Sequence, residues 1–286
     1  MGQAKGNILA SGTSARVRSW DGGQVLKCYR PHIKDRVIDN EFCALQIAAR
    51  AGLAVPKVSG RTEFMEERCL VMAAVDGRPL LEQALGHPGK ILGWISEMAE
   101  IQVRMHCESG EGLRGQKIDL PPLFERALPA GYERDALVKR LEVLDTGANK
   151  LCHGDYHLGN VMVQHGKLQV VDWGKAVCGS PAGDVARTFV LLRYGGLPQS
   201  ILWKYAEYAL GAVRGALAVA YRRAYLRHRS QLVGVNDETA FSREIGAWLP
   251  IMLASKLAFA PARVQRRMRA SLGKSLAKNL APDRIV

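Results

Sequence analysis

The sequence lacks the features that mark membrane-spanning and secreted proteins. No apolar run reaches the ~20 residues that cross a bilayer, and the best candidate, residues 209–220, is interrupted by Arg214. The N-terminus has no apolar core of the signal-peptide kind, and Gly6 stands where myristoylation requires Ser or Thr. We therefore expect an intracellular, cytoplasmic protein.

Paired cysteines and repeats are also missing. The six cysteines form no C-x-x-C pair, which argues against a zinc site or a disulfide framework and favours reduced thiols. There is no internal repeat and no low-complexity tract. With 286 residues, of which 48% are hydrophobic and 23% charged, the chain can form one large domain or two closely joined lobes.

Acidic residues are scarce in one part of the chain only. Residues 203–286 contain 15 Lys and Arg against 5 Asp and Glu, a net charge of +10, whereas the whole chain has a net charge of +13. This excess could bind nucleic acid, an acidic lipid or a phosphorylated substrate, or it could be a set of solvated helix faces. The sequence leaves these alternatives open.

Among the features present, residues 151–174 carry the most specific chemistry. An H-G-D motif ends at Asp155, Asn160 follows five residues later, and Asp172 opens D-W-G after two short apolar runs. These runs predict a hairpin with an amide before it and a carboxylate after it. Two acids and an amide suit a site that holds metal ions and orients a hydroxyl, which is what phosphoryl transfer requires.

The N-terminal part of the sequence contains the kinds of residue that hold phosphates. Residues 7–30 read as strands joined by turns, and the first turn, Ser11–Ser14, is small enough for its N–H groups to approach phosphates. It is not a Walker loop, because no G-K-S/T follows it. Lys27 lies on a predicted strand, and Glu41 lies at the edge of the apolar face of a predicted helix, Asp35–Arg50. We expect Glu41 to hold Lys27 against a nucleotide.

The remaining pattern divides the chain. Strands are predicted at 57–61 and 68–72, and helices at 91–107, 133–144, 185–192, 200–228, 240–258 and 262–280, while 109–132 reads as a connection. We predict a nucleotide-binding lobe at 1–75 and a helical lobe at 76–286, with the catalytic loop at 151–174 and substrate-region helices at 200–286. The fold class is α+β.

These motifs together resemble the aminoglycoside phosphotransferase/choline kinase-like family, the small-molecule branch of the protein-kinase-like fold. The resemblance spans about residues 7–192 and is strongest at H-G-D-Y-H-L-G-N, V-D-W-G and V-L-K-C-Y-R-P. It implies a bilobal fold, with a five-stranded sheet and one helix in the small lobe. It also implies that ATP and Mg²⁺ are the cofactors.

The resemblance assigns a role to each matching residue. Asp155 is the catalytic base or orienter of the acceptor hydroxyl, and Asn160 and Asp172 bind the Mg²⁺ ions. Lys27, held by Glu41, pairs with the α- and β-phosphates. The remaining cofactor-binding positions are Ser11, Gly12, Thr13 and Ser14 over the phosphates, and Met72, Ala73 and Val75 at the adenine.

The acceptor is less well defined. Aminoglycosides are polycations, so a basic C-terminal region favours a neutral or anionic hydroxylated compound such as a sugar. The segment from Gly174 to Asp184 is too short for a protein-kinase activation segment, which disfavours a peptide substrate. The alternative to an enzyme is a nucleotide-binding regulatory protein of the same fold, with a polyanion on its basic helices.

Overall fold

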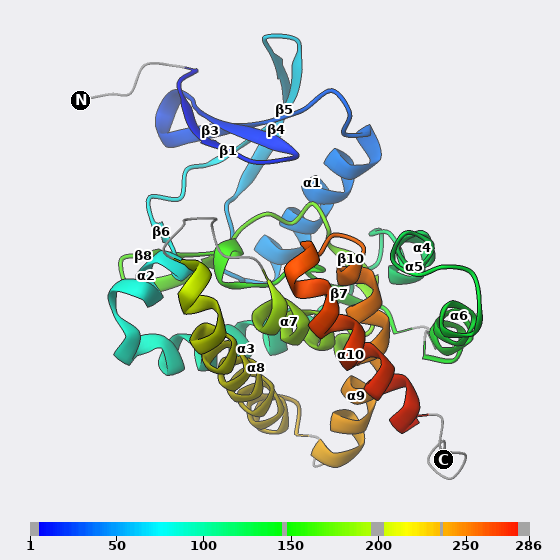
Figure 1. Cartoon of the computed structure of the whole chain (residues 1–286). Coiled ribbons are helices and arrows are strands. Elements are labelled where there is room, and N and C mark those ends of the chain that lie inside the picture. Colours follow the sequence, from blue (N-terminus) through cyan, green and yellow to red (C-terminus); the bar gives the residue numbers. More distant parts are fainter. Residues whose placement is uncertain (1–5, 145–147, 196–202, 235–236, 280–286) are drawn as a thin grey trace. The chain divides into compact units, whose positions relative to one another are not determined.

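The computed structural model describes residues 6–144, 148–195, 203–234 and 237–279 (Figure 1). The chain divides into two compact units, residues 1–87 with 158–176, and residues 88–157 with 177–286. The first unit contains the predicted N-terminal lobe, residues 1–75, and adds residues 76–87 and the hairpin segment 158–176. Each unit is considered by itself below.

A five-stranded antiparallel sheet forms the first half of the first unit. Its strands lie in the order β1-β2-β3-β5-β4. Their bounds are β1 (Ile8–Ser11), β2 (Ala15–Ser19), β3 (Gln24–Tyr29), β4 (Val58–Phe64) and β5 (Glu67–Ala73). Helix α1 (Asp35–Arg50) accompanies the sheet, which confirms the arrangement implied by the resemblance. A short 3-10 turn, Asp21–Gly23, links β2 to β3.

The expectation of reduced thiols was wrong for one pair of cysteines. Cys28 of β3 and Cys69 of β5 lie directly opposite each other in the antiparallel register and form a disulfide. They are separated by 41 positions in the sequence, so only the pairing of the two strands brings them together. Both are buried next to Leu26 in a small core that Trp20 and Phe64 cover.

The second part of this unit is built around the predicted hairpin. Strands β8 (Val161–Gln164) and β9 (Lys167–Val170) pair as expected, and β6 (Arg78–Pro79) adds a short third strand. Helix α2 (Leu80–Gly86) and the 3-10 turn η3 (Leu158–Asn160) pack beside them. The N–H of Val170 donates to the carbonyl of Ala54, which ties the hairpin to the segment that follows α1.

Helices dominate the second unit. They are α3 (Ile91–Cys107), α4 (Gln116–Asp119), α5 (Pro121–Ala127), α6 (Tyr132–Leu144), α7 (Pro181–Tyr194), α8 (Trp203–Val233), α9 (Glu238–Leu257) and α10 (Ala262–Asn279). A 3-10 turn (Pro88–Lys90) precedes α3, and two short strands, β7 (Lys150–Cys152) and β10 (Val177–Gly179), pair antiparallel. Among the described residues, no helix is both long and apolar enough to cross a membrane.

The prediction that residues 109–132 form only a connection was wrong, because α4 and α5 lie there. The proline pair that suggested a connection stands at the start of α5, where a missing N–H costs nothing. Helices α7, α8 and α9 pack together with the buried aromatic side chains of Tyr221, Tyr225 and Trp248. This helical core carries the H-G-D motif.

Candidate active site

The predicted lysine–glutamate pair forms. Lys27 Nζ donates to Glu41 Oε1 at 2.6 Å, and the Glu41 side chain is only 2% exposed. Tyr29 donates its hydroxyl to the other oxygen, Oε2, at 2.7 Å. Burial and the Glu41 carboxylate raise the pKa of Tyr29 above its usual range, so it stays a phenol and a donor. Glu41 is thereby fixed on both oxygens.

Lys27 also contacts the D-W-G motif. Its Nζ donates to Asp172 Oδ1 at 2.7 Å, and this carboxylate is 54% exposed. Burial opposes the charge of Lys27, but the carboxylates of Glu41 and Asp172 outweigh it and raise the lysine pKa above its usual range. The lysine is therefore a permanent cation placed between two acids, ready to pair with phosphate oxygens.

The D-W-G segment approaches α1 closely at position 174. A Cβ on Gly174 would lie 3.1 Å from Glu41 Oε2, so a side chain there would press on the carboxylate that holds Lys27. A second tie joins the same elements, because the buried amide of Asn40 donates to the carbonyl of Ala176 at 2.8 Å. Sequence reasoning missed both Asn40 and Tyr29.

Asn160 and Asp172, the predicted metal ligands, lie at the same end of the hairpin. Val161 pairs with Val170 in the β8–β9 register, and the Val171 N–H donates to the Asn160 carbonyl at 3.0 Å. Asp172 takes a φ of 62°, a left-handed conformation that Asp adopts more readily than most residues. Carboxylate and amide oxygens at one hairpin end are hard donors of the kind that Mg²⁺ prefers.

The Ser11–Ser14 turn joins β1 to β2, as predicted, and one arginine clamps it. The Arg30 guanidinium donates to the Gly12 carbonyl from Nε at 3.2 Å and from Nη2 at 3.1 Å. Nη2 also donates to Ser11 Oγ at 3.2 Å, and the Arg30 N–H donates to the Ser14 carbonyl at 2.9 Å. Thr13 lies between these anchored positions. The turn is thus held together by a cation that sequence reasoning missed.

The predicted adenine contacts lie at the end of β5. Met72 is buried and pairs with Val25 of β3 and Val58 of β4. The N–H of Ala73 already donates to the Lys57 carbonyl at 2.9 Å, so Ala73 could offer a base only its carbonyl oxygen. Val75 follows two residues later and is half-buried, and its N–H is the natural donor to such a base.

In the second unit, Asp155 follows a tightly turned backbone. Gly154 has a φ of 72°, a conformation in which glycine carries no steric penalty. The Asp155 N–H donates to Nδ1 of the fully buried His153 at 3.2 Å. Because Nδ1 accepts this bond, the proton of the neutral ring lies on Nε2. His153 therefore braces the loop, and its Nδ1 is not available as a base.

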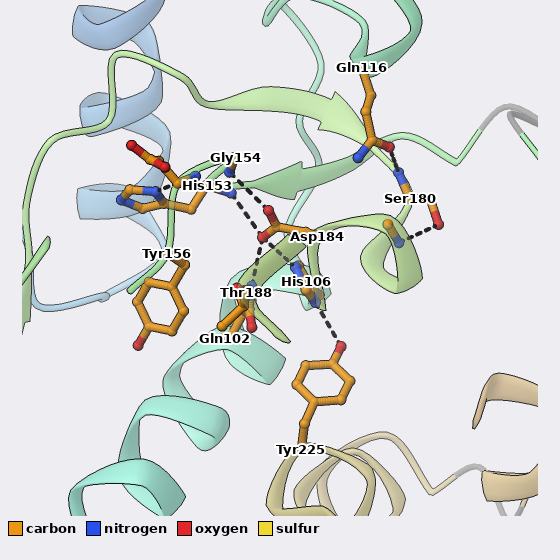
Figure 2. Close-up of polar contacts among 12 residues, drawn as sticks. Gln102, His106, Gln116, His153, Gly154, Tyr156, Ser180, Asp184, Thr188 and Tyr225 are labelled. Carbon is orange, nitrogen blue, oxygen red and sulfur yellow. Dashed lines mark hydrogen bonds and ion pairs between the residues drawn. The ribbon is translucent and has the colours of Figure 1, made fainter. Parts of the chain in front are cut away.

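Asp184 fixes the same loop from below (Figure 2). Its Oδ1 accepts from the Gly154 N–H at 2.9 Å, and its Oδ2 accepts from the His153 N–H at 3.1 Å. Gln102 Nε2 donates to Oδ2 at 2.7 Å, and His106 Nε2 lies 3.2 Å from the same oxygen. The helix that carries Asp184 is capped by Ser180, whose hydroxyl accepts from the Gly183 N–H.

The charge of Asp184 survives complete burial. Burial by itself would raise its pKa, but the bond from His106 and the loop N–H groups lower it to about 2. On the far side of His106, Nδ1 lies 2.7 Å from the Tyr225 hydroxyl. Burial raises the Tyr225 pKa well above its usual range, so Tyr225 donates to Nδ1 and leaves the Nε2–H of His106 for Asp184.

The predicted site residues are divided between the two units. All nucleotide and metal positions belong to the first unit, in which Lys27, Glu41 and Asp172 are joined by direct hydrogen bonds. Asp155 belongs to the second unit, in which its loop is held by Asp184. Sequence reasoning did not include Asp184 among the site residues, and its signal was an acid at the start of an otherwise apolar helix.

Comparison with solved structures supports a kinase-type fold. An amicoumacin kinase (hAmiN, in complex with AMP-PNP, Ca²⁺ and its ligand) is 13% identical, with a TM-score of 0.63 over 96% of this chain and 88% of that one. A choline kinase from Cryptosporidium parvum Iowa II is 13% identical, with a TM-score of 0.58 over 95% and 88%. An APH(2'')-IIia complex with GDP and kanamycin is 15% identical, with a TM-score of 0.54 over 98% and 95%.

The family follows from the sequence model rather than from these distant structures. No curated protein matches the chain significantly. The model of the phosphotransferase enzyme family (APH) matches residues 5–232, a range that contains every predicted site residue. The predicted resemblance, fold class and enzyme class are thereby confirmed, and the chain belongs to the phosphotransferase enzyme family.

Proposed function

We propose that this phosphotransferase moves the γ-phosphate of ATP to a hydroxyl group of a small molecule, with Asp155 orienting that hydroxyl. The observation that carries the proposal is the bonded set Lys27, Glu41 and Asp172. It places a permanent cation beside an exposed carboxylate at the end of a hairpin. Phosphoryl transfer depends on such positioning and charge neutralisation more than on covalent chemistry by the protein.

Lys27 is suited to the phosphates because its position is fixed and its charge does not titrate near neutral pH. Glu41 is saturated by Lys27 and Tyr29 and cannot swing away. Asp172, in contrast, is half-exposed, so its contact with Lys27 can give way when phosphate oxygens arrive. The Ser11–Ser14 turn would then cover the phosphates with its N–H groups, and the end of β5 would hold the adenine.

The donor set fits a divalent cation. Asn160 contributes an amide oxygen and Asp172 a carboxylate, and both lie at one end of the β8–β9 hairpin. This matches the preference of Mg²⁺ for a few oxygen ligands together with water and phosphate oxygens. When bound, the metal supplies charge neutralisation at the transferring phosphate. The Ca²⁺ and AMP-PNP in the amicoumacin kinase complex support this choice of cofactors by analogy.

Asp155 acts on the acceptor side. An ordinary aspartate is a weak base, so its main contribution is to align the acceptor oxygen, with the proton transferred late. The loop geometry serves this task, because Asp184 and His153 fix the backbone N–H groups from His153 to Asp155. A pre-organised carboxylate of this kind contributes through orientation rather than through a raised basicity.

A small acceptor is favoured over a protein. Only a short segment, made of a turn, β10 and the first residues of α7, separates the D-W-G motif from Asp184, which leaves no room for a peptide-binding activation segment. The solved relatives are described as kinases of amicoumacin and choline and as a kanamycin complex, all small molecules. We propose the same broad class here, namely aminoglycoside-, amino-alcohol- or sugar-like compounds with a free hydroxyl.

An ADP-release screen tests the function. The wild-type protein is incubated with Mg-ATP and a panel of aminoglycosides, amino alcohols, sugars and sugar phosphates, with Asp155→Ala as the blank. Turnover with one class of acceptor is expected, together with a drop of at least about 1,000-fold in kcat for the variant and little change in ATP binding. An Asp155→Ala protein with near wild-type turnover would show that another residue serves the acceptor.

A further inference from the structure

Two arginines from different helices meet on one face of α8. Gly211 and Gly215 are buried and one helical turn apart on that face. A Cβ on Gly211 would lie 3.1 and 3.2 Å from the two Nη atoms of Arg267 on α10, and a Cβ on Gly215 would be closer still to Nη1 of Arg193 on α7. Both guanidinium groups therefore lie against α8 where a side chain is missing, and Arg193 is half-buried whereas Arg267 is exposed.

The two groups lie against neighbouring turns of the same face of α8. Positions four residues apart on a helix have Cβ atoms about 5–6 Å apart, and each guanidinium lies next to one such position. Hydroxyl groups stand beside them. Arg193 Nε donates to the Tyr194 hydroxyl at 3.2 Å, and that hydroxyl lies 2.7 Å from Ser271 Oγ, one turn after Arg267 on α10. In Figure 1, α7 lies between α8 and α10.

No described carboxylate neutralises this pair. Neither Arg193 nor Arg267 is in an ion pair with any acid of the described residues. The described acids of the C-terminal third lie at or near the start of α9, where Asp237 caps the helix and Glu244 accepts from the Ser180 hydroxyl. Two like charges on neighbouring turns of one helix face repel each other, and an anion between them would relieve this repulsion.

A hydrogen bond to a helix end accounts for the position of the neighbouring Arg214. Among the described residues, no such bond accounts for Arg193 or Arg267. Arg214 Nε donates to the Leu192 carbonyl at 3.3 Å, which is the usual way for a cation to stabilise the C-terminal turn of a helix. For Arg193 and Arg267 no bond to a backbone carbonyl is present among the described residues. Their Nη groups offer the forked donors that match the oxygens of a phosphate or carboxylate.

We propose that Arg193 and Arg267 form an anion-binding subsite that takes the phosphate group of a phosphorylated, hydroxyl-bearing acceptor. A phosphate dianion balances the two positive charges, and Ser271 can donate a further hydrogen bond. Arg193 lies on α7, whose Asp184 holds the loop of Asp155 nine residues earlier, so this helix links half of the subsite to that loop. The acceptor role rests on the proposed function, whereas anion binding does not.

Calorimetric titration tests the subsite. Inorganic phosphate is added to the full-length protein saturated with Mg-AMP-PNP, which blocks binding of phosphate at the nucleotide. The wild type should bind phosphate, and Arg193→Gln/Arg267→Gln should bind it at least 10-fold more weakly. The matched control, Arg223→Gln/Arg266→Gln, removes two exposed arginines from α8 and α10 and should bind within about twofold of wild type.

Arg193→Lys/Arg267→Lys is a control for misfolding, because it keeps both positive charges. It loses the forked donor geometry of the guanidinium groups, so its affinity for phosphate should be intermediate. Equal weakening in the control pair, or unchanged binding in the glutamine pair, would overturn the subsite. Absence of phosphate binding to the wild type would do the same.

Kinetics test the acceptor role with pairs of acceptors, such as a sugar phosphate and the unphosphorylated sugar. Loss of both arginines should lower kcat/KM at least 10-fold for the phosphorylated member only, with the KM for ATP unchanged. Turnover confined to uncharged acceptors would overturn the acceptor role and leave the phosphotransferase intact. Phosphate bound at the arginines without turnover of any acceptor would support the subsite and contradict the proposed function.

Discussion

Lys27 and Asp172, which are 145 positions apart in the sequence, are hydrogen-bonded with 2.7 Å between Nζ and Oδ1. The bond couples the five-stranded sheet to the β8–β9 hairpin within the first unit. Because Asp172 is half-exposed while Glu41 is buried, Asp172 is the partner that can be exchanged. The arrangement predicts that the two carboxylates respond differently to substitution.

Asp172→Ala should abolish metal-dependent nucleotide binding while costing little stability. The exposed ion pair contributes about 0–1 kcal/mol to folding, so the unfolding temperature without ligand should change by only a few degrees. A thermal-shift titration with Mg-ATP should give a clear increase for the wild type and none for the variant. Asp39→Ala, which breaks the exposed pair with Arg61, is the matched control and should keep the increase.

Lys27→Met should be costly, because it leaves the buried Glu41 carboxylate without its cation. Breaking a buried pair on one side costs about 3–5 kcal/mol, and the Tyr29 hydroxyl alone cannot compensate. Lys27→Met/Glu41→Gln removes both charges and should recover part of the lost free energy of unfolding in urea titrations. If single and double variants were equally unstable, Glu41 would not depend on Lys27. Both should lack kinase activity.

Local features could be predicted from the sequence where the pattern was strong. The bounds of α1 and α3 agree with the predicted 35–50 and 91–107, because an apolar stripe and helix-ending residues define them. The Lys27–Glu41 pair also formed as predicted, since a strand lysine and an acid on the buried edge of a helix had few other partners. The two prolines at 121–122 led to the wrong prediction of a connection, because proline occurs both just after a helix and at its first position.

Contacts between distant segments could not be predicted in this way. Cys28 and Cys69 meet only through strand pairing, and Asp184 meets the catalytic loop 30 residues away through the packing of α7. An isolated aspartate at a helix start looks the same whether it caps the helix or binds a loop. Arg30 was likewise unrecognised, because a turn and the arginine that clamps it lie 18 positions apart.

Arg30→Ala should raise the KM for ATP about 10-fold and leave kcat nearly unchanged. The guanidinium makes three hydrogen bonds to Ser11 and Gly12, so its loss should disorder the turn that covers the phosphates without touching the acceptor side. Arg36→Ala removes an exposed arginine and controls for the charge change. Steady-state kinetics at saturating acceptor provide the measurement, and a fall in kcat alone would contradict a role in nucleotide binding.

Asp184→Asn should reduce kcat without changing the KM for ATP. An amide in place of one carboxylate oxygen would set a donor against the donors of His153, Gly154 and Gln102, so the loop that carries Asp155 should shift. We expect a 10–100-fold lower kcat and a loss of several kcal/mol of stability at pH 7, since an interaction with a buried charge is broken. Asp135→Asn, on the exposed start of α6, is the control.

The pH dependence of stability shows how much of the effect of Asp184→Asn comes from the lost negative charge and how much from the changed side chain. Its pKa is about 2 in the folded protein against a reference value of 3.8, so its contribution is fully present above pH 4 and is lost as the pH falls through 2. The shift corresponds to roughly 2 kcal/mol. The difference in unfolding free energy between wild type and Asp184→Asn should therefore be constant from pH 5 to 7 and shrink below pH 4. A difference that does not depend on pH would mean that the carboxylate is not held as an anion by these hydrogen bonds.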